Sequence, residues 1–292
     1  MHLSQDVADS RSCWCGASSW TLRFRTSRFG LIQCLRCGCY RIDPPPVKTS
    51  EQAESFYTQY YLGAARDTTR GTTKSSRFWR VAERVPPLQV PGQAALDFGC
   101  GEGILCAELK ASGWKSVVGF DVSQSRIARA RQSHPEIDFI EQGQGQSGLR
   151  CCSFDLVVMD NVVEHLLLPL ETLAELKGCI RPGGRIVVIT PNMESGCFRL
   201  LGRRWTPELA PHAHVFLFTP RALRSLAQRA GFVVDQVGHF HTGWLDLRDW
   251  IERLRSGVKR TSWCALQEAG KAYSWLVDAG PMLYAVCRHG SA

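Results

Sequence analysis

The sequence predicts an α/β protein with a doubly wound, mostly parallel sheet of seven strands. From residue 94 onward, short apolar runs typical of buried strands alternate with segments of helical periodicity. The links between these segments are short, so helices are expected to cover both faces of the sheet. Ligands of such folds bind beyond the carboxyl ends of the strands, which makes the residues after each strand the first candidates for function.

The expected elements follow one another in regular order. Strands are expected at residues 94–98, 116–121, 137–141, 154–160, 184–190, 232–238 and 281–288. Helices are expected at residues 103–112, 124–133, 169–180 and 219–230. An insertion at residues 244–280 precedes the last strand, and we interpret its tryptophans, which lie among arginines and lysines, as part of further helices.

Residues 94–103, Ala-Ala-Leu-Asp-Phe-Gly-Cys-Gly-Glu-Gly, are the most informative stretch of the chain. An apolar run stops at Asp97 and is followed by three alternate glycines, which predicts a buried strand, a turn that approaches a ligand closely, and a helix start. The next apolar run ends at Asp121, where a parallel second strand would present a carboxylate to ribose hydroxyls. The pattern indicates a nucleoside-binding βαβ unit.

The spacing of the glycines, at positions 99, 101 and 103, argues against a dinucleotide. Dinucleotide sites use G-x-G-x-x-G and place a pyrophosphate at the helix N-terminus. Here Glu102 occupies a position where a pyrophosphate needs positive potential, and Asp97 and Asp121 add further negative charge. A cationic nucleoside without phosphate fits this pattern better.

Two further segments extend the pattern. Residues 153–166 read Ser-Phe-Asp-Leu-Val-Val-Met-Asp-Asn-Val-Val-Glu-His-Leu, and residues 181–192 read Arg-Pro-Gly-Gly-Arg-Ile-Val-Val-Ile-Thr-Pro-Asn. Together with the glycine motif, and in this order, they resemble the class I S-adenosylmethionine-dependent methyltransferases. The resemblance implies a Rossmann-like methyltransferase fold whose last strand is antiparallel, S-adenosylmethionine as cofactor, and methyl transfer as the activity.

The resemblance also implies roles for single residues. Asp97 would hold the amino group of the cofactor and Asp121 both ribose hydroxyls, while Asp160 and Asn161 would face the sulfonium. The implied cofactor-binding residues are Asp97, Phe98, Gly99, Gly101, Glu102, Gly103, Asp121, Val122, Asp160 and Asn161. The loop at residues 142–146 lacks the acid that many relatives place against the adenine, so the adenine contacts there stay open.

Three histidines are candidates for the base that a phenol, alcohol or amine acceptor requires. His212 and His214 lie in a segment that resembles the family's loop at the acceptor site, and we favour His214. His165 follows Glu164, and this pair resembles part of a divalent-metal site in ubiquinone-type O-methyltransferases. Because Asn161 stands where that site has an acid, a structural hydrogen-bonding role is favoured over metal binding.

Residues 11–43 form a cysteine-rich module. Two cysteine pairs, each beside a glycine, have the composition of a tetrahedral thiolate site, and the alternating stretch between them predicts a hairpin strand. The expected zinc ligands are Cys13, Cys15, Cys34 and Cys37. The first pair is Cys-x-Cys instead of Cys-x-x-Cys, and Cys39 is a spare candidate, so a metal-free knuckle stays open as the alternative.

We expect three parts along the chain. A zinc-ribbon-like module occupies residues 11–43, a linker and a helical segment that covers the cofactor occupy residues 44–85, and the cofactor-binding domain occupies residues 86–292. One subset of class I methyltransferases resembles this order. The first residues are polar and acidic without the apolar core of a signal peptide, so we expect a cytoplasmic protein whose thirteen cysteines stay reduced.

The net charge of +8 is concentrated at the ends of the chain. Residues 1–43 carry +3 and residues 199–292 carry +6, with −1 between them. Basic ends favour an anionic substrate, an acidic carrier, nucleic acid or a membrane surface.

Among these options we expect a small-molecule acceptor that is methylated on oxygen. An RNA (guanine) methyltransferase is the first alternative, but the strand at 154–160 ends in Asp-Asn-Val-Val and lacks the Asp/Asn-Pro-Pro-aromatic motif used on exocyclic base amines, which argues against nucleic acid. A non-catalytic scaffold that binds the cofactor is the second alternative. Contact of residues 244–280 with a membrane or a lipid substrate also stays open.

Overall fold

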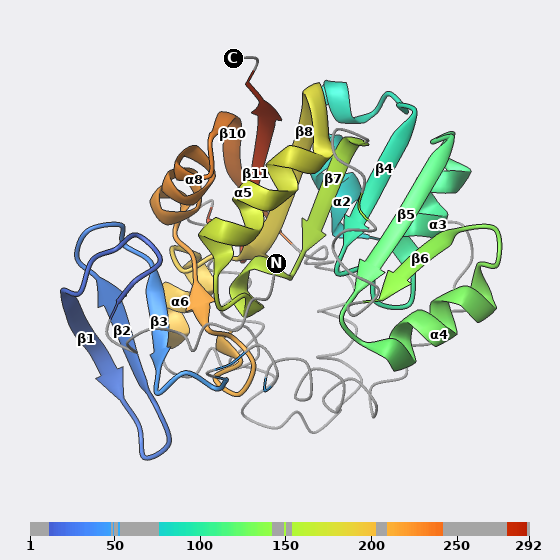
Figure 1. The fold of residues 1–292 in the computed structure, drawn as a ribbon. Coiled ribbons are helices and arrows are strands. Elements are labelled where there is room, and N and C mark those ends of the chain that lie inside the picture. Colours follow the sequence, from blue (N-terminus) through green and yellow to red (C-terminus); the bar gives the residue numbers. More distant parts are fainter. Residues whose placement is uncertain are drawn as a thin grey trace, which may run out of the picture.

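The structure is a computed structural model that describes residues 12–47, 49, 52, 76–141, 149, 154–202, 209–241 and 279–290. These residues form two β-sheets and the helices around them (Figure 1). None of the described helices is long and apolar enough to cross a membrane.

The larger sheet has seven strands in the order β10-β11-β8-β7-β4-β5-β6. Its strands are β4 (Ala94–Phe98), β5 (Ser116–Asp121), β6 (Asp138–Glu141), β7 (Phe154–Asp160), β8 (Ile180–Pro191), β10 (Phe232–Phe240) and β11 (Met282–His289). Neighbours are parallel except at β11, which pairs antiparallel with both β8 and β10. The predicted sheet, with its antiparallel last strand, is confirmed.

Helices cover both faces of this sheet (Figure 1). They are α2 (Arg77–Ala82), α3 (Ile104–Ala111), α4 (Gln124–Ser133), α5 (Pro169–Cys179) and α8 (Pro220–Arg229), with 3-10 turns η1 (Pro86–Leu88) and η3 (Val163–His165). A further helix, α6 (Gly196–Leu201), packs in a separate core with Leu31, Tyr40 and Ile42 of the cysteine-rich module. Successive strand residues belong to different cores: Leu96 packs with Leu173 of α5, whereas Ala95 packs with Phe78 of α2 and Leu109 of α3. Burial on both faces is the reason that these strands are continuously apolar in the sequence.

The smaller sheet contains the cysteine-rich module. Its order is β1 (Trp20–Arg25), β2 (Gly30–Cys34), β3 (Tyr40–Asp43) and β9 (Phe216–Leu217), all antiparallel. The predicted hairpin strand between the cysteine pairs is therefore present as β1. The fourth strand, β9, comes from the segment before α8, so two distant parts of the chain share this sheet.

Four strands differ from their expected bounds: β6 begins one residue later, β10 ends two residues later, β11 is shifted by one residue, and β8 differs most. β8 begins at Ile180, where a helix was expected to end, and it extends beyond the predicted 184–190. On the neighbouring strand β7, Phe154 pairs with Ile180 and Leu156 pairs with Arg185. The register therefore shifts, and the extra residues of β8 between Ile180 and Arg185 form an irregularity. Gly183, at φ +80°, supplies the backbone turn that this irregularity needs.

Several predictions concern residues outside the described ones. They are the helical insertion at 244–280 except its last two residues, the loop at 142–146, and most of the covering segment at 44–85. The described end of that segment contains α2, and η1 follows it at residues 86–88.

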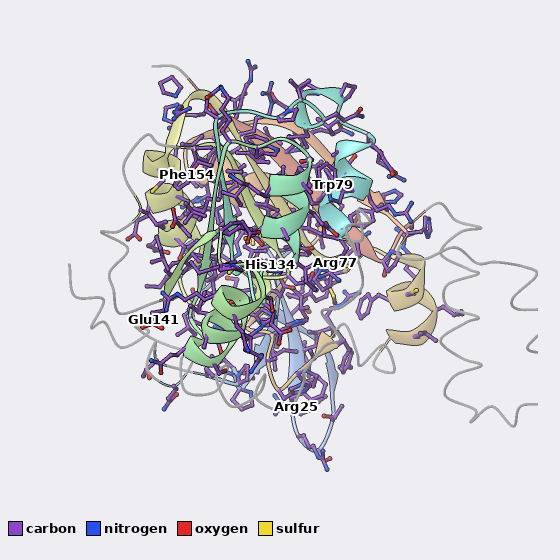
Figure 2. All side chains as sticks on the ribbon, turned by 90° about the vertical axis from the view of Figure 1, so that its right-hand side faces the viewer. Arg25, Arg77, Trp79, His134, Glu141 and Phe154 are labelled. Carbon is purple, nitrogen blue, oxygen red and sulfur yellow. The ribbon has the colours of Figure 1, made fainter. Side chains whose placement is uncertain are left out.

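A single buried carboxylate holds α2 against α3. Glu108 of α3 accepts hydrogen bonds from the backbone amide and the hydroxyl of Ser76, the residue before α2, and from the indole Nε1 of Trp79 at 2.8 Å. Trp79 and Arg77 are labelled on α2 in Figure 2. Glu108 thus satisfies donors at the N-terminus of α2 that the helix itself cannot pair.

We expect Glu108→Ala to lower the free energy of unfolding by about 2–3 kcal/mol, because it leaves the indole and the helix terminus without an acceptor. Urea denaturation followed by circular dichroism measures the change. Glu175→Ala, at an exposed position of α5, is the matched control and should stay within about 0.5 kcal/mol of the parent chain. Equal losses in the two variants would contradict this role of Glu108.

Candidate functional site

The loop between β4 and α3 has the conformation that the glycine motif predicts. Gly99, Gly101 and Gly103 have φ values of +87°, +58° and +81°. The amides of Gly99 and Cys100 donate to the carbonyl oxygen of Phe120 at 2.7 and 2.9 Å, which fixes the loop on the end of β5. A Cβ added at Gly99 would lie 2.3 Å from Cγ2 of Val162, so this position excludes any side chain.

Asp121 closes this loop from the next strand. One carboxylate oxygen accepts the amide of Gly101 and the other accepts the amide of Ser123, both at 2.8 Å. The carboxyl ends of β4 and β5 therefore meet at Asp121, as the βαβ pattern predicts.

Asp97 lies beside the loop at the end of β4 and is only 3% exposed. Desolvation, followed by the neighbouring Asp160, raises the pKa of Asp97 to about 8. Cys106 of α3 lies with its Sγ 3.6 Å from the Asp97 carboxylate. In the chain without a ligand, Asp97 is therefore mostly protonated at neutral pH.

Two arginines of α4 offset the negative charge that the sequence places here. Arg129 pairs with Glu102 at 2.8 Å, and Arg126 lies 4.0 Å from Asp121. Sequence reasoning missed both, although α4 follows Asp121 directly and their i, i+3 spacing places them on one side of that helix.

The aromatic and apolar residues predicted to contact the cofactor pack within the fold. The ring of Phe98 stacks on Phe120, with centroids 4.8 Å apart, and Val122 packs partly buried against the core of α5 and α8.

The end of β7 carries the next two predicted residues. Asp160 accepts a 2.7 Å hydrogen bond from Arg77 of α2, a partner that the sequence did not indicate. Asn161 has φ +56°, which is uncommon outside glycine. Within the described structure its side-chain oxygen is buried without a hydrogen-bond partner. Both side chains lie at the strand ends beside Asp97, consistent with their predicted position.

A buried cluster follows in η3 and in the segment before β9. Glu164 is fully buried and accepts a 2.9 Å hydrogen bond from Thr190 of β8, while its other oxygen lies 4.0 Å from Nε2 of His214. The rings of His165 and His214 meet edge to face with centroids 4.8 Å apart. The structure thus brings together two of the three predicted histidines, whereas His212 is exposed.

Burial sets the charge of this cluster. Desolvation raises the pKa of Glu164 to about 8 and lowers the pKa of His165 to about 4. His165 also lies with its Nδ1 3.2 Å from the carbonyl oxygen of Ala213, which orients its ring. Near neutral pH, His165 is uncharged and Glu164 is mostly protonated.

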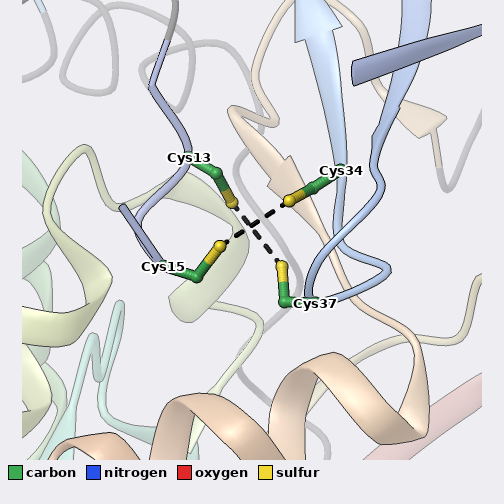
Figure 3. A group of neighbouring side chains, drawn as sticks. All are labelled: Cys13, Cys15, Cys34 and Cys37. Carbon is green, nitrogen blue, oxygen red and sulfur yellow. Dashed lines mark hydrogen bonds between the residues drawn. The ribbon is translucent and has the colours of Figure 1, made fainter. Parts of the chain in front are cut away.

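The four predicted zinc ligands converge in the cysteine-rich module (Figure 3). The Sγ atoms of Cys13 and Cys37 are 3.6 Å apart, as are those of Cys15 and Cys34, and all four lie within 4.8 Å of one another. These separations are too long for disulfides and close to the roughly 3.8 Å between thiolates around one tetrahedral zinc ion.

The spare candidate is not part of this group. Cys39 is buried, and its Sγ lies 3.4 Å from the carbonyl oxygen of Tyr40 and 3.3 Å from that of Leu217. Its thiol contacts β9 instead of completing the metal site.

We expect Gly99→Ala to weaken binding of S-adenosylhomocysteine by at least about tenfold, because the new Cβ meets Val162 and alanine disfavours a positive φ. Isothermal titration calorimetry measures the affinity. Gly178→Ala in α5 is the matched control: no atom lies within 4 Å of its new Cβ, and the affinity should not change. An unchanged affinity in Gly99→Ala would show that the loop tolerates a side chain.

Comparison with known proteins gives the same family. A family model described as a methyltransferase domain matches residues 75–237, more than half of the chain. A protein of Mycolicibacterium smegmatis named "Probable S-adenosylmethionine-dependent methyltransferase" is 34% identical over 151 residues, covering 51% of this chain and 56% of the relative.

Two further relatives have different named activities. The ubiquinone biosynthesis O-methyltransferase of Aromatoleum aromaticum is 29% identical over 150 residues, covering 48% of this chain and 64% of the relative. The tRNA U34 carboxymethyltransferase of Methylococcus capsulatus is 33% identical over 168 residues, covering 54% and 50%. The matched region spans less than two thirds of the length of each of these relatives.

A solved structure shows the same fold. The S-adenosylmethionine-dependent methyltransferase of Mesorhizobium loti superimposes with a TM-score of 0.53 at 20% identity, covering 75% of this chain and 100% of the other. With the domain match over residues 75–237 and the glycine loop closed by Asp121, the chain belongs to the class I S-adenosylmethionine-dependent methyltransferases.

Proposed function

We infer that this enzyme methylates an oxygen atom of a small-molecule acceptor. The observation that carries the proposal is the buried group of Glu164, His165 and His214, which follows the strand that ends in Asp160. A hydroxyl acceptor must lose a proton, and this group places a histidine on the side of the site where the sulfonium is expected. The likeness to a ubiquinone O-methyltransferase supports oxygen as the acceptor atom.

The residues at the strand ends would hold the cofactor. S-adenosylmethionine supplies an activated methyl group when it is bound, and the chain has to align that group with the acceptor and exclude water. Asp121 accepts one backbone amide on each oxygen and keeps further lone pairs for the ribose hydroxyls. The carboxylate of Asp97 would pair with the amino group of the methionine part.

His214 is the proposed base. It is 7% exposed, its Nε2 faces Glu164, and its ring packs on the neutral His165. A positive charge on His214, after it takes a proton from the acceptor, would favour ionisation of the nearby Glu164, whose carboxylate would then stabilise that charge. His165 would keep the ring of His214 in place.

A methyltransferase acting on RNA is the second candidate. The described part of the module, residues 12–43, has a basic surface. It exposes Arg23, Arg25, Arg28 and Arg36, and its only acidic residue is Asp43. One relative is named a tRNA U34 carboxymethyltransferase. Retention of RNA that falls steeply with salt would favour this candidate, because phosphate contacts release counterions.

The cysteine cluster is proposed to bind structural zinc. Four buried thiols at tetrahedral separations are the donor set that zinc prefers.

The affinity for S-adenosylhomocysteine is expected to rise about tenfold between about pH 6.5 and pH 8. The pKa of Asp97 is about 8 without a ligand, so at low pH binding of the ligand's amino group must first remove a proton from the carboxyl group. Asp97→Asn should bind more weakly and show a flatter profile. Asp138→Asn, at an exposed position of β6, is the control; a profile that keeps its slope in Asp97→Asn would assign the titration to another group.

Transfer of tritiated methyl groups from S-adenosylmethionine tests the proposed function. A panel of phenols and alcohols is compared with bulk RNA, and we expect incorporation into a small molecule. Asp121→Ala should remove at least about 99% of it, because the ribose contact and the loop closure are both lost, whereas Asp138→Ala should not. Incorporation into RNA alone would replace this proposal by the second candidate.

A further inference from the structure

We propose that the metal-filled four-cysteine site positions residues 209–219, the segment that carries His212 and His214, over Glu164. The inference rests on the proposed zinc binding and extends it. It gives the module a role in placing Glu164, His165 and His214, the group that we call the acceptor side of the site. The segment lies between the module on one side and η3 on the other.

The module supplies the main-chain partners of β9, and at the next residue, Phe218, the carbonyl oxygen accepts the amide of Met193 at 3.0 Å. In the part of the chain that the structure describes, β9 pairs with β3 alone, with Tyr40 opposite Leu217 and Arg41 opposite Phe216. The amide of Ile42 donates to the carbonyl oxygen of Val215 at 3.3 Å and continues the ladder toward His214. A strand of two residues has no stability of its own, so its conformation depends on its neighbours, and β3 is the neighbour that pairs with both of its residues.

The cysteine knuckle itself contacts the same segment. The Sγ of Cys39 lies 3.3 Å from the carbonyl oxygen of Leu217, and the amide of Cys34 donates to the carbonyl oxygen of Cys39 at 2.8 Å. Arg221, in the first turn of α8, donates to the carbonyl oxygen of Arg36 at 3.0 Å. The knuckle between Cys34 and Cys39 is therefore connected to both ends of the β9–α8 junction.

On its other side the segment contacts Glu164 and His165 of η3. The amide of Val215 donates to the carbonyl oxygen of Glu164 at 2.8 Å, and the His165 ring lies 3.2 Å from the carbonyl oxygen of Ala213. His214 lies between these two contacts. A displacement of β9 would therefore move His214 relative to Glu164 and His165.

Metal binding is what makes this support rigid. A module of fewer than about 40 residues does not bury enough apolar surface to fold firmly alone, and metal binding supplies the missing stability. The glycine loop, by contrast, is held by Phe120 and Asp121, which lie on β5 and not in the module. Loss of the metal should therefore loosen residues 214–219 and leave the glycine loop and β5 in place.

Hydrogen exchange of the full-length protein tests this inference. The zinc-loaded chain is compared with the same chain after removal of zinc by a chelator under reducing conditions, and metal content is measured in both. We expect amides of residues 214–219 to exchange at least about tenfold faster without zinc, while residues 94–121 change by less than about twofold. Calorimetry with S-adenosylhomocysteine should give the same affinity in both forms.

A pair of variants tests the contact without removing the metal. Cys39→Ala should speed exchange in residues 216–219 several-fold at unchanged zinc content, because the thiol contact with Leu217 is lost. Cys287→Ala, at a buried position of β11, is the matched control and should leave these amides unchanged.

Three outcomes of these measurements would contradict the inference. Unchanged protection of residues 214–219 after zinc removal, equal loosening of residues 94–121, or a folded chain that binds no zinc would overturn the inference. The measured affinity for S-adenosylhomocysteine reports separately on the proposed methyltransferase function, so failure of one can be told from failure of the other.

Discussion

The hydrogen bond from Gly101 to Asp121 is the contact on which the rest of the site depends. It joins the loop after β4 to the end of β5 at 2.8 Å, and the amides of Gly99 and Cys100 reinforce it through Phe120. These bonds require left-handed backbone in the loop, which glycine adopts without strain. These bonds give the loop a shape that permits close approach of a nucleoside.

The negative charges of the carboxyl groups around this loop are accommodated in different ways. Asp121 accepts hydrogen bonds from backbone amides, Glu102 pairs with Arg129 and Asp160 pairs with Arg77, whereas burial penalises the charge of Asp97 and raises its pKa. Several buried carboxylates could not all be ionised at such short range. A cationic ligand would give Asp97 a positively charged partner and so favour its ionised form. The charges at this site are therefore compatible with a sulfonium nucleoside.

The cysteine-rich module is integrated into the catalytic domain. Its sheet is completed by β9, and its buried cysteines pack in the same core as Phe216 and Phe218. The segment that forms β9 also carries His214 toward Glu164. The module, for which we propose zinc binding, can therefore influence the position of His214 relative to Glu164.

The sequence by itself determined the central sheet, the glycine loop and the four-cysteine group, because each follows from local periodicity or from residue spacing. The strands β4, β5 and β7 have their predicted bounds for this reason. Only the tertiary structure decided that β9 joins the module, that Arg77 pairs with Asp160, and that His214 meets Glu164. These contacts join residues far apart in the chain, and their partners depend on strand register and helix packing that no local pattern specifies.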